Sequence, residues 1–211
     1  MAPIMKLVRL GGAALCDTGP VIQPDLVPDQ TLRATKLLDL LRAKNGFYAF
    51  ESALHVFPAG AAHDGPSLAD WNTGTGWRGE YGSLAEGCFF FAEDIFGGQF
   101  CLFDGCVMGF DPETGEKRFM ASTIEEWAGA LLADPDVLTG YPLAHEWQVR
   151  HGAVPPGARL IPRVPFVLGG ELTPENLSII DAARGMRSRA NLAVQIRDLP
   201  DGAAVNFKLV D

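Results

Sequence analysis

The chain has 211 residues, of which 47% are hydrophobic and 20% charged, and its formal net charge is −9. These values are typical of one globular domain, or of one domain with an appendage, and they exclude a disordered chain. The acidic balance and the lack of a Lys/Arg-rich stretch argue against nucleic acid and anionic membranes as partners.

Residues 1–24 are predicted to be a lead-in to the domain. Lys6 and Arg9 precede the apolar run 10–15, which is too short for a secretory signal and puts bulky Leu15 before Cys16. We expect this run to be a strand or an extended lead-in. No apolar stretch reaches the roughly 20 residues that span a bilayer, so a cytoplasmic protein is expected.

A helix is predicted from Asp29, whose side chain can cap it, to the Asn45-Gly46 stop signal. Its apolar face repeats at helical spacing through Leu32, Leu37, Leu38 and Leu41. Residues 47–57 follow as an aromatic-rich extended run, and residues 58–67 as a loop.

The segment 71–82 combines four glycines with the large rings of Trp71, Trp77 and Tyr81. This composition predicts a mobile or tightly turned loop that holds bulky groups. A meander of strands is predicted next, over residues 88–92, 99–103, 106–110 and 117–121, because turn sequences such as Asp104-Gly105 separate these apolar runs.

Two helices and a strand-rich tail complete the prediction. Ser122 and Glu125 form a capping box for a helix that ends near residues 134–135, and a short helix follows over residues 142–149. Residues 155–165 are predicted to be an extended connector. Apolar residues then alternate over 192–197 and 205–209, which predicts two more strands and a small strand-rich C-terminal extension over residues 151–211.

The negative charge is concentrated in the middle of the chain. Residues 51–146 hold 16 acidic and three basic residues, a net charge of −13, whereas the two flanks carry +2 each. Most acidic proteins use such charge for solubility. The alternative is an acidic docking surface, on which charge accelerates encounter and aromatic residues supply affinity.

Motifs for catalysis or cofactor binding are missing from the sequence. It has no phosphate-binding loop, no GxSxG, no HExxH and no CxxC pair, so we expect no cofactor, no metal site and free cysteines. Glu93 and Asp94 are the most enzyme-like pair, since carboxylates after an apolar strand can have raised pKa values. Neighbours in a strand point to opposite faces, however, so Asp94 is more simply explained as an acceptor in the following turn.

Several short segments resemble the SUKH superfamily, which unites bacterial immunity proteins with fungal regulators of cell-wall assembly. These segments are residues 41–47, 90–100, 112–116, 126–127 and 141–143. The resemblance covers about residues 25–150, and the tail resembles an extension of some bacterial members. It implies an α+β fold with a mainly antiparallel sheet flanked by helices, and a non-enzymatic protein that neutralises a toxin delivered between competing cells.

The resulting hypothesis is that the acidic middle region docks on a basic toxin domain. Trp71, Trp77 and Tyr81 would be the anchors. The electrostatic partners would be Asp70, Glu80, Glu93 and Asp94. Three alternatives stay open. The rings can fold back over the sheet as core lids. The site of a small hydrolase or ligand-binding enzyme can form from Glu93, Asp94 and a histidine, or the protein can be a regulatory scaffold.

Overall fold

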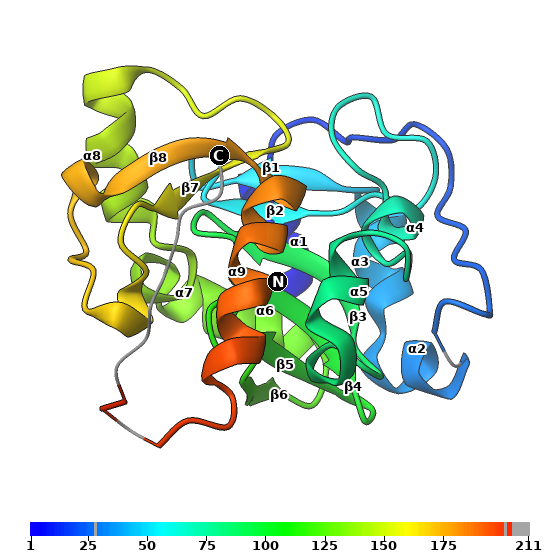
Figure 1. Ribbon diagram of the computed structural model, residues 1–211. Coiled ribbons are helices and arrows are strands. Elements are labelled where there is room, and N and C mark those ends of the chain that lie inside the picture. Colours follow the sequence, from blue (N-terminus) through cyan, green and yellow to red (C-terminus); the bar gives the residue numbers. More distant parts are fainter. Residues whose placement is uncertain (28, 201, 204–211) are drawn as a thin grey trace.

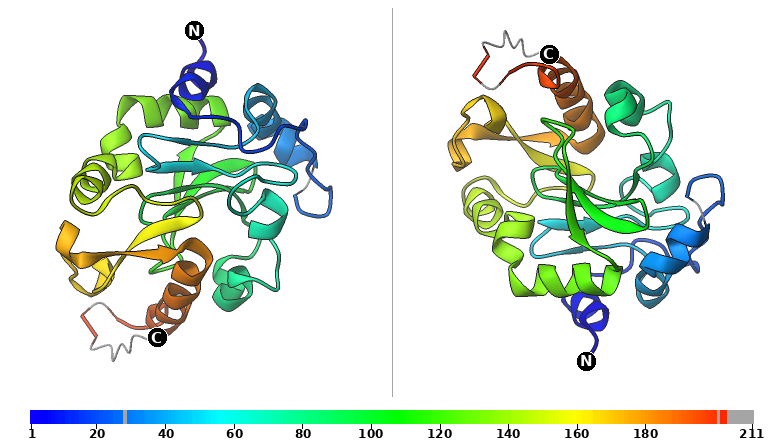
Figure 2. Two further views of the ribbon diagram at one scale, coloured as in Figure 1. Left: turned by 90° about the horizontal axis from the view of Figure 1, so that it is seen from above. Right: turned by 90° about the horizontal axis from the view of Figure 1, so that it is seen from below.

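The computed structural model describes residues 1–27, 29–200 and 202–203, and Figure 1 shows its arrangement. A six-stranded antiparallel sheet runs in the order β1-β2-β3-β4-β5-β6, and a second sheet contains β7 and β8. Helices lie around the main sheet on all sides, as the two views of Figure 2 show. The predicted α+β class with a mainly antiparallel sheet is therefore confirmed.

The main sheet is a meander in which each strand pairs with the next one along the chain. Its strands are β1 (Phe47–Ala49), β2 (Leu54–Val56), β3 (Phe89–Asp94), β4 (Gln99–Phe103), β5 (Cys106–Phe110) and β6 (Lys117–Ala121). The last three have the predicted bounds. Asp104 and Gly105 both have positive φ, 48° and 73°, which is the geometry of the tight hairpin turn that their sequence indicates.

Nine α-helices surround the sheet within the described residues. They are α1 (Pro3–Leu10), α2 (Asp29–Thr35), α3 (Leu37–Ala43), α4 (Leu68–Trp71), α5 (Trp77–Tyr81), α6 (Ile124–Ala133), α7 (Pro135–Thr139), α8 (Tyr141–His151) and α9 (Ala182–Ile196). The predicted single helix from Asp29 is broken at Lys36, whose φ of 60° is left-handed. The predicted cap of α6 is displaced by one residue, because the Thr123 hydroxyl accepts the Glu126 N–H.

The hydrophobic core lies on both faces of the main sheet. Residues 89–93 of the central strand β3 are all buried, so side chains on both of its faces are covered. On one face, Trp127 of α6 packs on the ring of Phe91 in β3, with the ring centroids 5.0 Å apart. The apolar run over residues 88–92, which predicted a strand, therefore belongs to a central strand of the sheet and not to an edge strand.

The N-terminal segment differs from its prediction, because it begins with α1. Ile4, Leu7 and Val8 of this helix are buried, a pattern of helical spacing that a search limited to residues 10–15 misses. The following residues are extended and cover the outer edge of β1, where Gly12 donates its N–H to the Tyr48 carbonyl at 2.8 Å. Among the residues described, no helix combines the length and apolar character that crossing a membrane requires.

The C-terminal extension contains more helix than strand. Its strands are β7 (Ala158–Pro162) and β8 (Leu177–Asp181), and the predicted strand over 192–197 is wrong because α9 occupies most of it. Four small or flexible residues face the core from this helix: Ala182, Met186, Ala190 and Ala193. Their helical spacing begins ten residues before the short alternation that suggested a strand. The predicted strand over 205–209 lies outside the described residues.

Candidate functional site

The three aromatic residues that were expected as docking anchors are buried. Trp71 ends α4, while Trp77 and Tyr81 are the first and last residues of α5. Adjacent rings contact one another at centroid distances of 5.3 and 5.6 Å, and Trp77 also packs on Phe90 of β3 at 4.9 Å. The segment is therefore a turn over residues 72–76 between two short helices, so the predicted loop is wrong over Trp77–Tyr81. Its rings cover the sheet as lids rather than standing exposed for a partner.

A groove of about 690 Å³ opens above Trp71 and Trp77. One wall comes from residues 65–77, in the loop before α4 and in α4 and α5. The other comes from the starts of β7 and α9. The two tryptophans are only 2% exposed, so they form the floor of the groove. In Figure 2 the helix α5 lies beside α9, although about 100 residues separate them in the sequence.

Exposed carboxylates stand on both walls of this groove. Asp70 on one wall accepts hydrogen bonds from the Ser67 N–H and hydroxyl, at 3.1 and 2.6 Å. Asp181 on the other wall caps α9 by accepting the Arg184 N–H at 2.9 Å. The capping bonds hold each carboxylate in place while the side chain stays open to solvent. The groove is thus acidic on both sides and aromatic at its floor.

Glu80 lies beside the groove and pairs with Arg187, a lining residue of α9, at 3.4 Å. Both side chains are about half exposed, so this ion pair contributes little to stability. Of the residues singled out in the sequence, the fold therefore brings Asp70, Trp71, Trp77 and Glu80 to one place. Asp181 was missed, although an Asp before a run of small residues is a recognisable helix cap.

A buried ion cluster lies beneath the groove floor. The Glu93 carboxylate is 2.9 Å from the Arg159 guanidinium and 3.1 Å from His55 Nδ1, and all three side chains are at most 1% exposed. Burial alone would raise the pKa of Glu93, but Arg159 and the His55 hydrogen bond outweigh it and hold that pKa below its usual value. Burial lowers the pKa of His55 to about 4. At neutral pH the cluster is an ionised Glu93–Arg159 pair beside a neutral histidine.

This cluster is connected to the floor and to one wall of the groove. Gln99 donates to the Glu93 carboxylate at 3.2 Å and accepts the Trp71 indole N–H at 2.8 Å. Arg159 belongs to β7, whose first residue Ala158 lines the opposite wall. The cluster therefore fixes the position of the floor and of one wall at the same time.

The expected electrostatic roles of Glu93 and Asp94 need correction. Glu93 is 1% exposed and cannot meet a partner in this conformation. Asp94 accepts the N–H groups of Phe96 and Gly98, both at 2.8 Å, so it closes the turn as its alternative interpretation predicted. The hydrolase hypothesis gains the expected histidine neighbour, His55, but the pair is closed to solvent. Within the described ranges, no three His, Cys, Asp or Glu residues gather as metal ligands would.

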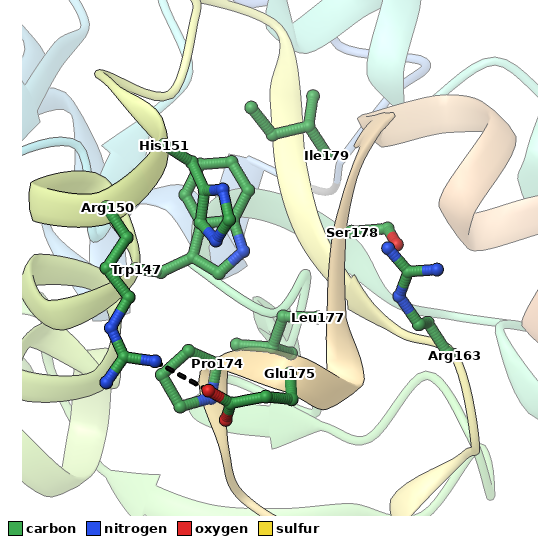
Figure 3. Close-up of a pocket in the computed structure, with 9 residues that line it drawn as sticks. All are labelled: Trp147, Arg150, His151, Arg163, Pro174, Glu175, Leu177, Ser178 and Ile179. Carbon is green, nitrogen blue, oxygen red and sulfur yellow. Dashed lines mark hydrogen bonds and ion pairs between the residues drawn. The ribbon is translucent and has the colours of Figure 1, made fainter.

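A second pocket, of about 540 Å³, lies between α8 and β8 and is shown in Figure 3. The rings of Trp147 and His151 of α8 contact each other on one side of it, with centroids 4.5 Å apart and planes tilted by 36°. Arg150 is turned toward Glu175 at 2.6 Å, and Arg163 lies on the opposite side near Ser178. Sequence reasoning missed this pocket, because its residues come from three separate segments with no common motif.

No protein-family model and no curated protein sequence matches the chain. Among solved structures, the chain is similar to the crystal structure of Atu4351 from Agrobacterium tumefaciens, with a TM-score of 0.51 over 87% of this chain and 86% of that chain. The sequence identity is 13%, so the similarity concerns the fold alone.

Proposed function

We propose that the chain is a non-enzymatic immunity protein, which neutralises a toxin domain by docking on it with the groove between α4–α5 and α9. The proposal rests on the resemblance of residues 25–150 to the SUKH superfamily and on the chemistry of the groove. Its decisive observation is the pair of exposed carboxylates, Asp70 and Asp181, held over an aromatic floor. A regulatory scaffold with a basic partner inside the same cell would use the same surface.

The groove fits a lysine or arginine side chain of the partner. Such a cation would approach between the two carboxylates and form ion pairs with them, above the buried indole rings of the floor. Of the 16 acidic residues between positions 51 and 146, twelve are exposed. This excess of negative charge would accelerate the encounter with a basic toxin, because steering acts over about one Debye length, roughly 8 Å at physiological salt.

The test is a charge-neutral variant that preserves both helix caps. Asn caps α9 at position 181 as well as Asp does. At position 70 the cap of α4 is Ser67, and an Asn amide oxygen can still accept the Ser67 N–H. The double variant Asp70→Asn/Asp181→Asn therefore removes two charges from the groove and keeps both caps. The control, Asp134→Asn/Asp136→Asn, removes two exposed charges at α7, away from the groove. A toxin partner is first identified by rescue of growth when the two proteins are co-expressed.

We expect the groove variant to bind that toxin at least tenfold more weakly and to lose rescue, while the α7 variant behaves like the wild type. Most of the loss should appear in the association rate and should shrink at high salt. Wild-type affinity and rescue in the groove variant would show that docking occurs elsewhere. Failure of any toxin to be neutralised, together with hydrolysis of a small substrate by the purified protein, would overturn the proposed function itself.

A further inference from the structure

Three of the four outer edges of the two sheets are protected against pairing with another strand, and one is open. The edge of β1 is covered by residues 12–16, of which Gly12 donates its N–H to Tyr48 of β1, while Leu15 and Cys16 donate to the two residues before the strand. The edge strand β6 carries Lys117 and Arg118, and a register shift leaves Met120 without a partner residue. Charges and bulges of this kind keep an edge from accepting further strands. The edge of β7 is engaged, since Leu160 donates its N–H to the Ile95 carbonyl at 2.9 Å.

The fourth edge, that of β8, has neither a backbone partner nor a register shift in the part of the chain that the structure describes, and its one charged residue, Asp181, is the last of the strand. The strand has the sequence Leu-Ser-Ile-Ile-Asp and pairs with β7 over five residues without a register shift. It contains no lysine, arginine or proline, and the Ile179 side chain is 39% exposed. A regular, β-branched edge strand with an exposed apolar side chain is a template for strand addition.

The hydrogen-bond register shows which backbone groups this edge presents. Leu160 points its N–H away from β8, toward Ile95, so Leu160 and its partner Ile179 form a non-hydrogen-bonded pair. The flanking bonds agree with this register, since Ala182 donates to Gly157 at 2.9 Å. The N–H and C=O of Ile179 therefore point outward, and neither has a backbone partner among the described residues.

A pocket beside this edge can receive side chains of an added strand. It is the cavity of about 540 Å³ between α8 and β8, into which Ile179 and Leu177 project from β8 and Trp147 and His151 from α8 (Figure 3). Strand addition draws its affinity from main-chain hydrogen bonds and its selectivity from such neighbouring pockets.

The charge of the pocket identifies the occupant that fits. Arg150 is already paired with Glu146 and Glu175, but Arg163 and His151 have no carboxylate partner within the described ranges. An arginine side chain without an anionic partner favours a carboxylate. We propose that the free edge of β8 binds an extended, acidic segment of a partner protein as a third strand. This site is separate from the acidic groove and does not depend on the function proposed above.

The probe is a blocked octapeptide of alternating glutamate and valine, compared with its lysine–valine counterpart. Amide exchange is followed residue by residue by NMR on the full-length chain. We expect the acidic peptide to bind with a dissociation constant below about 1 mM, and to slow exchange of the Ile179 N–H at least tenfold at saturation. The basic peptide should bind at least tenfold more weakly than the acidic one.

Two pairs of variants test the contacts separately. Ile179→Pro removes the outward N–H but no hydrogen bond to β7, and proline is tolerated on the free side of an edge strand. This variant should not bind the acidic peptide. Ile179→Thr keeps the N–H and should still bind the peptide. Arg163→Glu should remove the preference for the acidic peptide, and Arg187→Glu, on α9, should not. The proposal is overturned if the acidic peptide gives no protection or if Ile179→Pro binds it like the wild type. The proposal is also overturned if the Ile179 N–H is protected from exchange without any peptide. Protection that rises with protein concentration indicates that a second copy of the chain occupies the edge, and protection that does not indicates that the same chain occupies it.

Discussion

The buried histidine His55 should make the protein less stable as the pH falls from 7 to 5. Its ring is 0% exposed and stacks on Tyr48 at 4.2 Å, and burial lowers its pKa from 6.5 to about 4. As the pH falls, the unfolded chain binds a proton near pH 6.5, while the folded protein stays unprotonated until about pH 4. Stability is therefore lost on acidification through this window.

The size of the effect follows from the shift in pKa. Each pKa unit corresponds to 1.36 kcal/mol, so the complete shift corresponds to about 3 kcal/mol, of which about 2 kcal/mol is expressed between pH 7 and pH 5. The lowered pKa of Glu93 acts in the same direction but at lower pH, below its usual value of 4.5. Asp94 acts in the opposite direction, because burial raises its pKa to about 7. The wild-type pH dependence alone therefore does not isolate His55.

The assay is urea unfolding at both pH values for the wild type and for His55→Gln, in which an amide that does not titrate replaces the ring. Between pH 7 and pH 5, the variant should lose about 2 kcal/mol less unfolding free energy than the wild type loses. The control His145→Gln, at an exposed histidine paired with Glu51, should follow the wild type. An equal pH dependence in His55→Gln and wild type would refute the buried, neutral histidine.

Three further experiments test other parts of the structure. Asp94→Asn keeps the oxygen that accepts the turn N–H groups but cannot ionise. The wild type loses stability as the pH rises toward 7 and Asp94 ionises, and the variant should not show this loss when urea unfolding is compared at pH 5 and 7. Arg159→Met should cost about 3–5 kcal/mol at pH 7, because it leaves the Glu93 carboxylate buried without its cation, and the additional change Glu93→Gln should recover part of that loss in a double-mutant cycle. Thr123→Ala should lower the unfolding free energy by about 1 kcal/mol because it removes the cap of α6, whereas Thr123→Ser keeps the cap and should leave the unfolding free energy unchanged. Thermal unfolding of the two variants measures this difference.

The local structure of the main sheet was largely predictable from the sequence, because its strands are separated by turns with strong local preferences. Asp104-Gly105 and the turn over 112–115 depend on backbone conformations that few other residues adopt, so they mark strand ends whatever the rest of the fold does. The α6 helix was found for the same reason, since its cap is a local signal. The error of one residue arose because Ser122 and Thr123 are both acceptable caps.

The elements that were missed owe their conformation to distant contacts. Within the glycine-rich stretch 74–82, Trp77–Tyr81 is helical because Trp77 and Tyr81 are buried against the sheet and α9, where the Tyr81 hydroxyl donates to the Pro112 carbonyl at 2.6 Å. Local propensity alone would not make a five-residue helix around Gly79. The candidate groove was predicted in part. Asp70 and the two tryptophans were singled out and lie together at the groove, although the tryptophans are buried rather than exposed as anchors. Their neighbour Asp181 lies about 110 residues away, and only the fold places it on the opposite wall.

The buried ion cluster constrains the order in which the molecule can be completed during synthesis. His55 and Glu93 leave the ribosome before Arg159, so the growing chain contains a carboxylate at the centre of its main sheet before the cation that neutralises it exists. α9, which packs on the same core and donates from Arg189 to the Phe96 carbonyl at 2.6 Å, is made later still. The first 150 residues therefore cannot bury their own centre without cost. A chain that ends before β7 should be recognised as unfinished by the proteases and chaperones of the cell.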